Sequence, residues 1–474
     1  MARFSSTTFH RRSASGPAKQ TTKPCRQRIN SMNIQKNKRR LGAVAAMTAT
    51  GLAIFTASSA TAGELTETQY ILNTFSFLVH GFLVMFMAAG FAMLESGLVR
   101  SKNTATICLK NIALYSIAGL TFYIIGYNLM YAGVDGGYMG SFQIWGGDNA
   151  DALAGNFDGG YAAESDWFFQ MVFVATAASI VSGTLAERIK LWPFLAFVVI
   201  LTAVIYPIQG AWQWGGGWLS EAGFSDFAGS TLVHSVGGWA ALTGALILGA
   251  RKGKYTSGGI HPLPGANLPL ATLGTFILWL GWFGFNGGSQ LALASAADAI
   301  AISTIYINTN IAAVGGVLAA MVLTQLVYKK VDLSMALNGA IAGLVSITAG
   351  PDSPAMGQAL LIGAVGGALV VFLVPLLDKF KIDDVVGAIP AHLGAGIWGT
   401  LAVPLTNADA SFAAQITGVV AIGGFVIVAS TIAWLALKFT VGIRVSEEDE
   451  MLGLDQAELG MEAYPEFGRG SQSL

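Results

Sequence analysis

Two copies of one short pattern hold the residues best suited to chemistry in this chain. The pattern reads D-x-x-G-x-x-x-x-H and runs from Asp226 to His234, and again from Asp384 to His392. An imidazole can donate and accept a hydrogen bond and can relay a proton. Both copies run into long apolar stretches, where an ionisable side chain is energetically costly and usually functional. Two histidines at matching positions of two repeats indicate one site at the interface of the repeats, near the middle of a membrane.

The composition is that of a membrane protein. Hydrophobic residues make up 53% of the 474 residues and charged residues only 11%, whereas an average soluble domain has about 25% charged residues. Residues 1–63 contain eleven Lys or Arg and no Asp or Glu, so the rest of the chain is acidic and lacks the basic surface that nucleic-acid binding needs. Cys25 and Cys108 form no disulfide framework. Because no metal-ligand cluster or nucleophile–base motif is present, we expect no cofactor, no metal site and no enzymatic activity.

A basic segment, a short apolar segment and an Ala-Thr-Ala site follow one another within residues 36–62. This order is typical of a secretory signal peptide, and the apolar part is too short to span a bilayer. We therefore expect residues 1–62 to be a leader that is removed, with the mature chain beginning near Gly63. Two interpretations of residues 1–31 stay open: Met32 is the true start, or the segment is an organellar transit peptide.

Eleven apolar stretches of spanning length follow the leader. A bilayer core about 30 Å thick requires about 20 apolar residues in a helix. The sequence thus predicts an all-α polytopic membrane protein with eleven transmembrane helices. The expected spans are 68–98, 105–132, 167–187, 191–212, 227–250, 268–289, 298–327, 335–350, 356–377, 386–404 and 412–438.

The charges of the connecting loops alternate along the chain. The odd-numbered loops contain lysine or arginine and the even-numbered loops contain neither. By the positive-inside rule, this alternation places the mature N-terminus outside the cell and the C-terminus in the cytoplasm. We therefore expect a membrane domain at 63–440, a cytoplasmic tail at 441–474, and a multi-pass location in the cell (inner) membrane. The charged loop residues are Arg100, Lys102, Arg188, Lys190, Arg251, Lys252, Lys254, Lys329, Lys330, Lys379 and Lys381.

This topology places the two motifs on opposite faces of the membrane. Asp226 is expected at the outer end of the fifth helix and Asp384 at the inner end of the tenth. Eight helical residues advance about 12 Å, so His234 and His392 reach similar depths in a core of about 30 Å. Five helices per repeat, in opposite orientations, make an inverted-topology repeat, to which the eleventh helix is added.

The motif at 226–234 resembles a signature of the ammonium transporter family (Amt/Mep/Rh). Five further segments resemble other motifs of the family in the same order, which makes the match specific. The tail and the tryptophan-rich outer loop resemble the bacterial and plant Amt branch. The five segments are 92–103, 183–188, 281–289, 338–345 and 442–448.

The resemblance implies a homotrimer with one conduction pore in each subunit. It implies an outer site for ammonium made of Phe173, Trp214 and Ser289. Phe173 and Phe285 would stack beneath this site as a gate. His234 and His392 would line the pore below the gate.

These residue types suit ammonium for physical reasons. Aromatic faces attract cations, and a serine hydroxyl can accept an N–H bond. A bare cation at the bilayer centre is costly, so we expect ammonium to lose a proton and ammonia to pass, with or without a separate proton. The alternative function is an ammonium sensor that signals through its tail. Uptake of methylammonium distinguishes the two.

Several charged residues near helix ends have more than one interpretation. The resemblance places Asp226 just behind the outer site, where capping of the fifth helix and proton transfer both stay open. Asp384 is expected to be a cap. We expect Glu95 to pair with backbone or a neighbouring helix, and Lys110 to extend to the inner membrane surface.

Two other segments have expected roles at the inner face. Glu187 and Arg188 are expected to form an ion pair at a helix end. The tail contains an acidic run at 447–450, which by itself is typical of a solvated segment. The resemblance implies that the tail couples subunits and binds a PII-type signalling protein. The family tail often has His-Gly where this chain has Leu459 and Gly460, so the mode of docking stays open.

The signal-peptide interpretation predicts the N-terminus of the mature protein. Sequencing of protein purified from membranes should give an N-terminus near Gly63, because the Ala-Thr-Ala site ends at Ala62. An N-terminus at Met1 or Met32 would contradict the cleavage.

Overall fold

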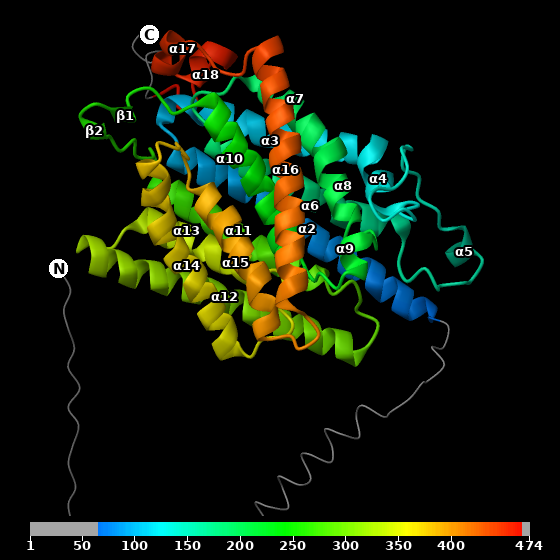
Figure 1. Ribbon diagram of the computed structural model, residues 1–474. Helices are drawn as coiled ribbons and strands as arrows, with labels where there is room; N and C mark the ends of the chain where they lie inside the picture. The colour runs from blue at the N-terminus through cyan, green and yellow to red at the C-terminus, as the bar shows by residue number, and fades with distance from the viewer. Residues whose placement is uncertain (1–64, 467–474) are drawn as a thin grey trace, which may run out of the picture. The chain divides into compact units, whose positions relative to one another are not determined.

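The computed structural model describes residues 65–466 as a bundle of helices with a short β-hairpin (Figure 1). The leader expected at 1–62 lies outside the described residues. The first half contains α2 (Glu67–Leu98), α3 (Thr104–Thr121), α4 (Tyr127–Tyr131), α5 (Ala150–Leu153), α6 (Ala163–Thr184), α7 (Leu191–Ile200), α8 (Tyr206–Ala211), α9 (Trp218–Glu221) and α10 (Val236–Leu248). The hairpin strands are β1 (Tyr255–Thr256) and β2 (Gly259–Ile260), which pair antiparallel. The second half contains α11 (Leu268–Gly288), α12 (Ala296–Tyr328), α13 (Leu333–Ile347), α14 (Met356–Lys379), α15 (Ala395–Ala402), α16 (Phe412–Thr440), α17 (Glu447–Leu452) and α18 (Leu454–Leu459).

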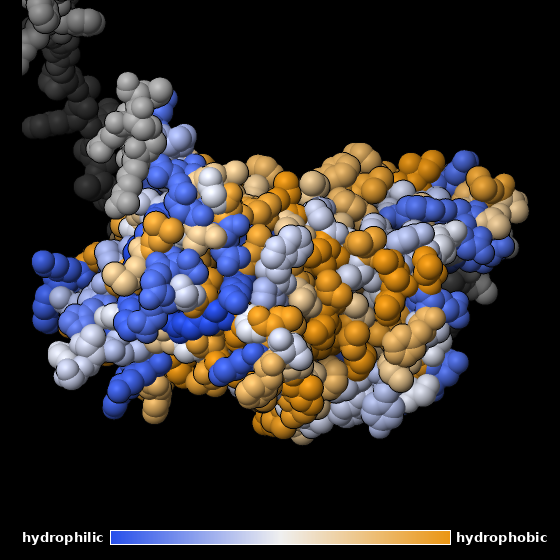
Figure 2. Space-filling view, turned by 90° about the horizontal axis from the view of Figure 1, so that it is seen from above, coloured by the Kyte–Doolittle hydropathy of each residue, from blue (hydrophilic) through white to orange (hydrophobic). Residues whose placement is uncertain are grey.

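The surface of the bundle is apolar over a wide area. Nine helical segments within residues 65–466 are long and apolar enough to cross a membrane. Large hydrophobic side chains lie exposed along them, such as Phe75 and Phe82 of α2 and Val420 of α16. Figure 2 shows a broad hydrophobic area across the middle of the molecule, with hydrophilic residues gathered toward its ends. Apolar surface of this extent is unfavourable in water and fits a lipid environment. The expectation of a polytopic helical membrane protein is confirmed.

Two of the expected spans correspond to short helical segments in the structure. The eighth overlaps Leu333–Ile347 and the tenth overlaps Ile389–Leu405. The 15 residues of α13 cover about 22 Å, less than the thickness of a bilayer core. They can be short because neighbouring helices surround them: α13 packs against α12 and α14, and most of its residues are buried. The count of eleven helices and their orientation stay predictions.

The two repeated motifs fold in the same way. Gly229 and Gly387 have φ angles of 108° and 79°, a left-handed conformation that glycine adopts without steric strain. Each motif then forms a π-helical turn that contains its histidine, at Ser230–Ser235 and at Ile389–Gly394. The turns continue into α10 and α15. The sequence did not predict these π-helical turns, a form that occurs frequently at functional sites.

The motifs enter the bundle from opposite ends. We call the end with the β-hairpin, α17 and α18 the tail face, and the opposite end the tryptophan face (Figure 1). On the tryptophan face, the indole N–H of Trp214 donates to the Asp226 carbonyl at 3.0 Å. Toward the tail face, the Thr184 hydroxyl donates to the Asp384 carboxylate at 3.0 Å.

The described part of the tail is folded onto the bundle. The Asp455 carboxylate accepts hydrogen bonds from two backbone N–H groups at the start of α3, at 2.8 and 2.9 Å. Glu458 accepts one from the first residue of α7 at 3.1 Å. Carboxylates at helix N-termini satisfy free N–H groups and complement the helix dipole. Glu450 of the acidic run is buried and bonded to Arg444 and to the Lys252 N–H, so the solvated interpretation is wrong for this residue.

Candidate functional site

The three residues expected at the outer site line one cavity at the tryptophan face. The cavity has a volume of about 290 Å³, and Phe173, Trp214 and Ser289 all contribute to its wall. The Ser289 hydroxyl donates to the Phe285 carbonyl at 2.9 Å, which leaves its oxygen free to accept a hydrogen bond. The Trp214 ring lies edge-on to Phe173, with centroids 6.1 Å apart. The cavity thus offers a small cation two aromatic rings and a hydroxyl acceptor.

A buried carboxylate lies at the same cavity. Tyr127, Tyr131, Tyr161, Asp166 and Gln170 all line it. Asp166 accepts hydrogen bonds from the Tyr127 hydroxyl and, at 3.4 Å, from the Gln170 amide. Burial and the Asp166 charge raise the pKa of Tyr161 to about 12, so this phenol is neutral at pH 7. A carboxylate beside an aromatic cavity favours a cation. Asp166 has no distinctive signal in the sequence, because an aspartate in the first turn of a helix is usual.

Two stacked phenylalanines separate this cavity from the histidines. The ring centroids of Phe173 and Phe285 are 3.9 Å apart and the planes differ by 23°. Both side chains are buried. The His234 ring follows, with its centroid 5.2 Å from that of Phe285, and it stacks on Trp282 at 4.9 Å. A solute leaving the cavity toward the histidines would have to displace a phenylalanine ring.

His234 and His392 meet in the middle of the bundle, although they are far apart in the sequence. Their Nδ1 atoms are 3.2 Å apart, and their ring centroids are 5.3 Å apart. A hydrogen bond between two Nδ1 atoms requires one ring to donate and the other to accept. The two Nε2 atoms then have opposite characters, one an acceptor and one a donor. Nε2 of His234 has no hydrogen-bond partner among residues 65–466, so it is available to a small solute.

The first residue of each motif holds its helix start in place. Asp226 is fully buried, and its oxygens accept hydrogen bonds from four backbone N–H groups at 2.8 to 3.0 Å, those of Gly229, Ser230, Thr231 and Leu232. This is the geometry of a helix cap. Asp384 accepts two backbone N–H bonds, at 3.2 and 2.7 Å, in addition to the bond from Thr184. The contacts of both aspartates are therefore those of caps.

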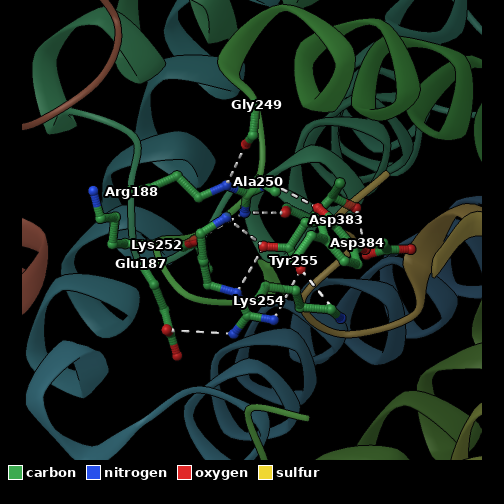
Figure 3. Close-up of polar contacts among 12 residues, drawn as sticks. Glu187, Arg188, Gly249, Ala250, Lys252, Lys254, Tyr255, Asp383 and Asp384 are labelled. Carbon is green, nitrogen blue, oxygen red and sulfur yellow. Dashed lines mark hydrogen bonds and ion pairs between the residues drawn. The ribbon is translucent and has the colours of Figure 1, made fainter. Parts of the chain in front are cut away.

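Glu187 and Arg188 do not pair with each other, contrary to the expectation (Figure 3). Arg188 is fully buried and donates to four backbone carbonyls, those of Thr184, Ala186, Gly249 and Asp383. Burial lowers its pKa to about 10, so it is still charged at pH 7. Glu187 contacts Arg100 and Arg251. The φ of Glu187 is 70°, a left-handed turn that directs the neighbouring side chains to different partners.

Asp383 joins the loop after α10 to the start of the second motif (Figure 3). Its carboxylate accepts two hydrogen bonds from the Arg251 guanidinium, at 2.9 and 3.0 Å, and Lys254 lies 3.4 Å away. Burial alone would raise the pKa of Asp383. Hydrogen bonds from Arg251 and the charges of Arg188 and Arg251 outweigh it and hold the pKa well below its ordinary value. Because Asp383 directly precedes Asp384, its bidentate salt bridge with Arg251 positions the second motif.

Comparison with known proteins agrees with the motifs. The sequence profile of the Ammonium Transporter Family matches residues 75–464. This chain belongs to the ammonium transporter family. It is similar to the ammonium transporter Amt2 of Archaeoglobus fulgidus, with 43% identity over 423 residues, covering 82% of this chain and 87% of that protein. It is also similar to Amt1 of Haloferax mediterranei, with 37% identity over 415 residues, covering 82% of this chain and 78% of that protein.

Solved structures of the ammonium transporter family share the fold. A sensor Amt protein has a TM-score of 0.77 and 35% identity, covering 83% of this chain and 99% of that chain. Candida albicans Mep2 has a TM-score of 0.73 and 27% identity, covering 83% of this chain and 90% of that chain. The resemblance inferred from the motifs is confirmed.

The Asp383 pair predicts a stability loss that depends on pH. Asp383→Asn should lower the free energy of unfolding at pH 7 by about 3 kcal/mol, because it removes the bidentate partner of the buried Arg251 and leaves that guanidinium only Glu187, at 3.3 Å. Folding lowers the pKa of Asp383. The stabilisation that its carboxylate contributes is therefore present at pH values above the unfolded pKa near 4, and it is lost as the pH falls below that unfolded value. The difference between variant and wild type should therefore shrink in acid.

Thermal unfolding in detergent at several pH values measures this effect. Asp409→Asn, which changes an exposed loop aspartate, is the matched control and should leave the melting temperature unchanged. An Asp383→Asn protein as stable as wild type at pH 7 would contradict the positioning role.

Proposed function

We propose that this protein is an ammonium transporter or channel of the cell membrane. Ammonium is recruited at the tryptophan face, loses a proton, and passes along the histidine pair as ammonia, with or without a separate proton. The observation that carries this proposal is the succession of an aromatic cavity, a stacked phenylalanine pair and a buried imidazole pair through the bundle. The relatives named as ammonium transporters support it. In this proposal the tryptophan face lies outside and the tail face in the cytoplasm, as the loop charges predict.

Recruitment uses the cavity of about 290 Å³. The faces of Trp214 and Phe173 attract the cation, by about 2 kcal/mol when water is excluded, and the Ser289 oxygen accepts one N–H bond. The buried Asp166 carboxylate adds long-range attraction. A site of this kind favours ammonium over sodium, whose hydration is costlier to remove. Aromatic attraction alone does not exclude potassium, so discrimination needs a second step.

The second step is passage through an uncharged segment. Beyond the Phe173 and Phe285 rings, a bare cation would lose its hydration, which costs several kcal/mol or more. Ammonia avoids most of that cost and can both donate and accept hydrogen bonds. The paired imidazoles of His234 and His392 present one acceptor and one donor in series, which matches ammonia and not potassium. The proton released at the tryptophan face either stays outside or moves along the imidazoles.

A sensor is the second candidate, because one structure of similar fold is named a sensor Amt protein. The contacts of the folded tail with the loops, such as the hydrogen bond from the Lys252 N–H to Glu450 at 2.6 Å, offer a route from pore to tail. In this chain the uninterrupted succession of cavity, gate and histidine pair favours transport. A protein that binds ammonium but takes up no methylammonium would support the sensor.

We further propose that 63–440 forms the membrane domain, that three copies assemble, and that 441–474 is a cytoplasmic regulatory tail that binds a PII-type protein. The exposed apolar side chains of α2 are consistent with contact to lipid or to a neighbouring copy. Crosslinking in the membrane tests the trimer.

Trp214→Leu should weaken ammonium recruitment. Loss of a cation–π contact of about 0.5 to 2 kcal/mol raises the KM for methylammonium uptake about 2- to 30-fold, and discrimination against larger cations should fall. Trp192→Leu is the control, because Trp192 is 76% exposed on α7. Equal KM values for the Trp214 and Trp192 variants would count against the site.

The histidines should act as one unit, because they share one hydrogen bond. His234→Ala and His392→Ala should each lower methylammonium uptake by roughly 10²-fold, and the double variant should be little worse than the poorer single variant. His261→Ala, in an exposed loop, serves as control. Flux losses that multiply, with selectivity against potassium intact, would refute the paired site.

A further inference from the structure

A small cavity lies on the tail-face side of the histidine pair. It has a volume of about 20 Å³, and His392, Glu95, Asn338 and Val386 contribute to its wall. That volume suffices for about one water molecule, and an ammonia molecule is of similar size. A solute that passes the histidines toward the tail face therefore meets Glu95 next.

Glu95 has a buried carboxylate oxygen without a partner. The residue is 1% exposed, and its Oε2 accepts a hydrogen bond from the Ser182 hydroxyl at 2.7 Å. Its Oε1 accepts no hydrogen bond of ordinary geometry among residues 65–466, although the Asn111 side chain of α3 lies beside the carboxylate. Leaving a buried polar atom unbonded costs about 1 to 3 kcal/mol. An unbonded oxygen beside a cavity of molecular size indicates that a small ligand supplies the missing hydrogen bond.

A purely structural role for Glu95 would be that of a counter-charge to the buried Lys110. The expected extension of Lys110 to the membrane surface is wrong, because the residue is 1% exposed. Its Nζ donates to the Ser182 carbonyl at 2.9 Å and lies 4.8 Å from the centre of the Phe194 ring. The ion pairs of the described residues do not include Lys110 with Glu95. Ser182 contacts both side chains, through its hydroxyl to Glu95 and its carbonyl to Lys110, and the Lys110 ammonium does not reach ion-pair distance of Oε1.

A larger cavity leads from this point to the tail face. It has a volume of about 550 Å³, and its wall includes Asn338, Val386, Asp384, Arg251 and Lys254. Asn338 and Val386 line both cavities, and the Asn338 amide donates to the Val386 carbonyl at 3.1 Å. A solute leaving His392 thus passes Glu95 before it reaches the charged residues drawn in Figure 3.

We propose that Glu95 returns a proton to ammonia in the cavity below His392, which makes this cavity a second ammonium site. The proposal rests on the proposed transport function and adds that the proton crosses with the ammonia. In this step the O–H bond of protonated Glu95 breaks, and the nitrogen lone pair of ammonia forms the new N–H bond. Glu95 is left as a carboxylate, which the Ser182 hydroxyl and the nearby Lys110 charge stabilise.

The proton balance closes within the transport cycle. The proton that Glu95 gives up is the one that ammonium lost at the tryptophan face. His234 takes that proton at Nε2 and passes its Nδ1 proton to Nδ1 of His392. The Nε2–H bond of His392 then breaks as the O–H bond of Glu95 re-forms, directly or through the one water that the cavity can hold. The two basic groups that face Glu95, Lys110 from α3 and His392 from the second motif, therefore have separate roles in charge stabilisation and proton delivery.

The test uses the full-length protein in liposomes and two measurements after an ammonium or methylammonium pulse. One is the electrical current and the other is uptake of labelled methylammonium. The decisive variant is Glu95→Gln combined with Lys110→Met, because it removes both buried charges together and so preserves charge balance. Glu95→Gln alone and Glu95→Asp accompany it, and Glu221→Gln, an exposed carboxylate on the tryptophan face, is the control.

If Glu95 transfers the proton, the double variant should lose roughly 10²-fold of the current while uptake falls much less. The interior should become alkaline, since ammonia then arrives without its proton. Glu95→Asp should restore part of the current, and Glu221→Gln should match wild type. Recovery of wild-type current in the double variant would overturn the proposal, because it would mean that Glu95 only neutralises Lys110.

Uptake and current in the wild-type protein distinguish failure of proton return by Glu95 from failure of the transport function. Methylammonium uptake by wild type without any current would refute proton return by Glu95 and leave the transport function standing. Absence of both uptake and current in wild type would refute the transport function itself, and proton return by Glu95 with it.

Discussion

The high cost of a bare charge in the middle of the bundle is the constraint on which the rest of this structure depends. Between the cavity at the tryptophan face and the small cavity at Glu95, the rings of Phe173, Phe285, His234 and His392 contact one another in succession. No fixed charge of the described residues lies between Phe285 and His392 along this succession. A neutral molecule that can donate and accept hydrogen bonds suits this segment, and a hydrated cation does not. Charged groups lie at the two ends of this segment, where they have hydrogen-bond partners or counter-charges.

The position of each histidine follows from the backbone before it. In both motifs an aspartate accepts the free N–H groups of a helix start, a left-handed glycine turns the chain, and a π-helical turn carries the histidine inward. The two helix starts differ in the groups that hold them in place. Asp226 relies on four backbone N–H bonds, whereas the second motif is also held by Asp383 through Arg251 and Arg188. The same residues contact the loops on which the tail packs. The second histidine is therefore connected to the tail more directly than the first.

Periodicity and loop charge predicted much of the fold. Long apolar stretches became helices close to their expected bounds, because a segment in lipid must satisfy its own backbone hydrogen bonds. The segments at 333–347 and 389–405 also lie close to their expected bounds, and they can be short because helices buried among other helices need not match the bilayer thickness. The ion pairs were predicted poorly. Glu187 and Arg188 are adjacent in sequence, but a positive φ angle separates their side chains, and the counter-charges come from distant loops.

By itself, the sequence determined the family, the helical membrane class and the identity of the paired histidines, because motif spacing and hydropathy are local properties of the chain. Only the tertiary structure decided which groups face one another. It brought Phe173 onto Phe285, and Nδ1 of His234 to within 3.2 Å of Nδ1 of His392. It also put Asp166 at the outer cavity and Glu95 below the histidines, two carboxylates that look like helix-end residues in the sequence. Their placement depends on side-chain packing between helices far apart in the chain, which no local pattern records.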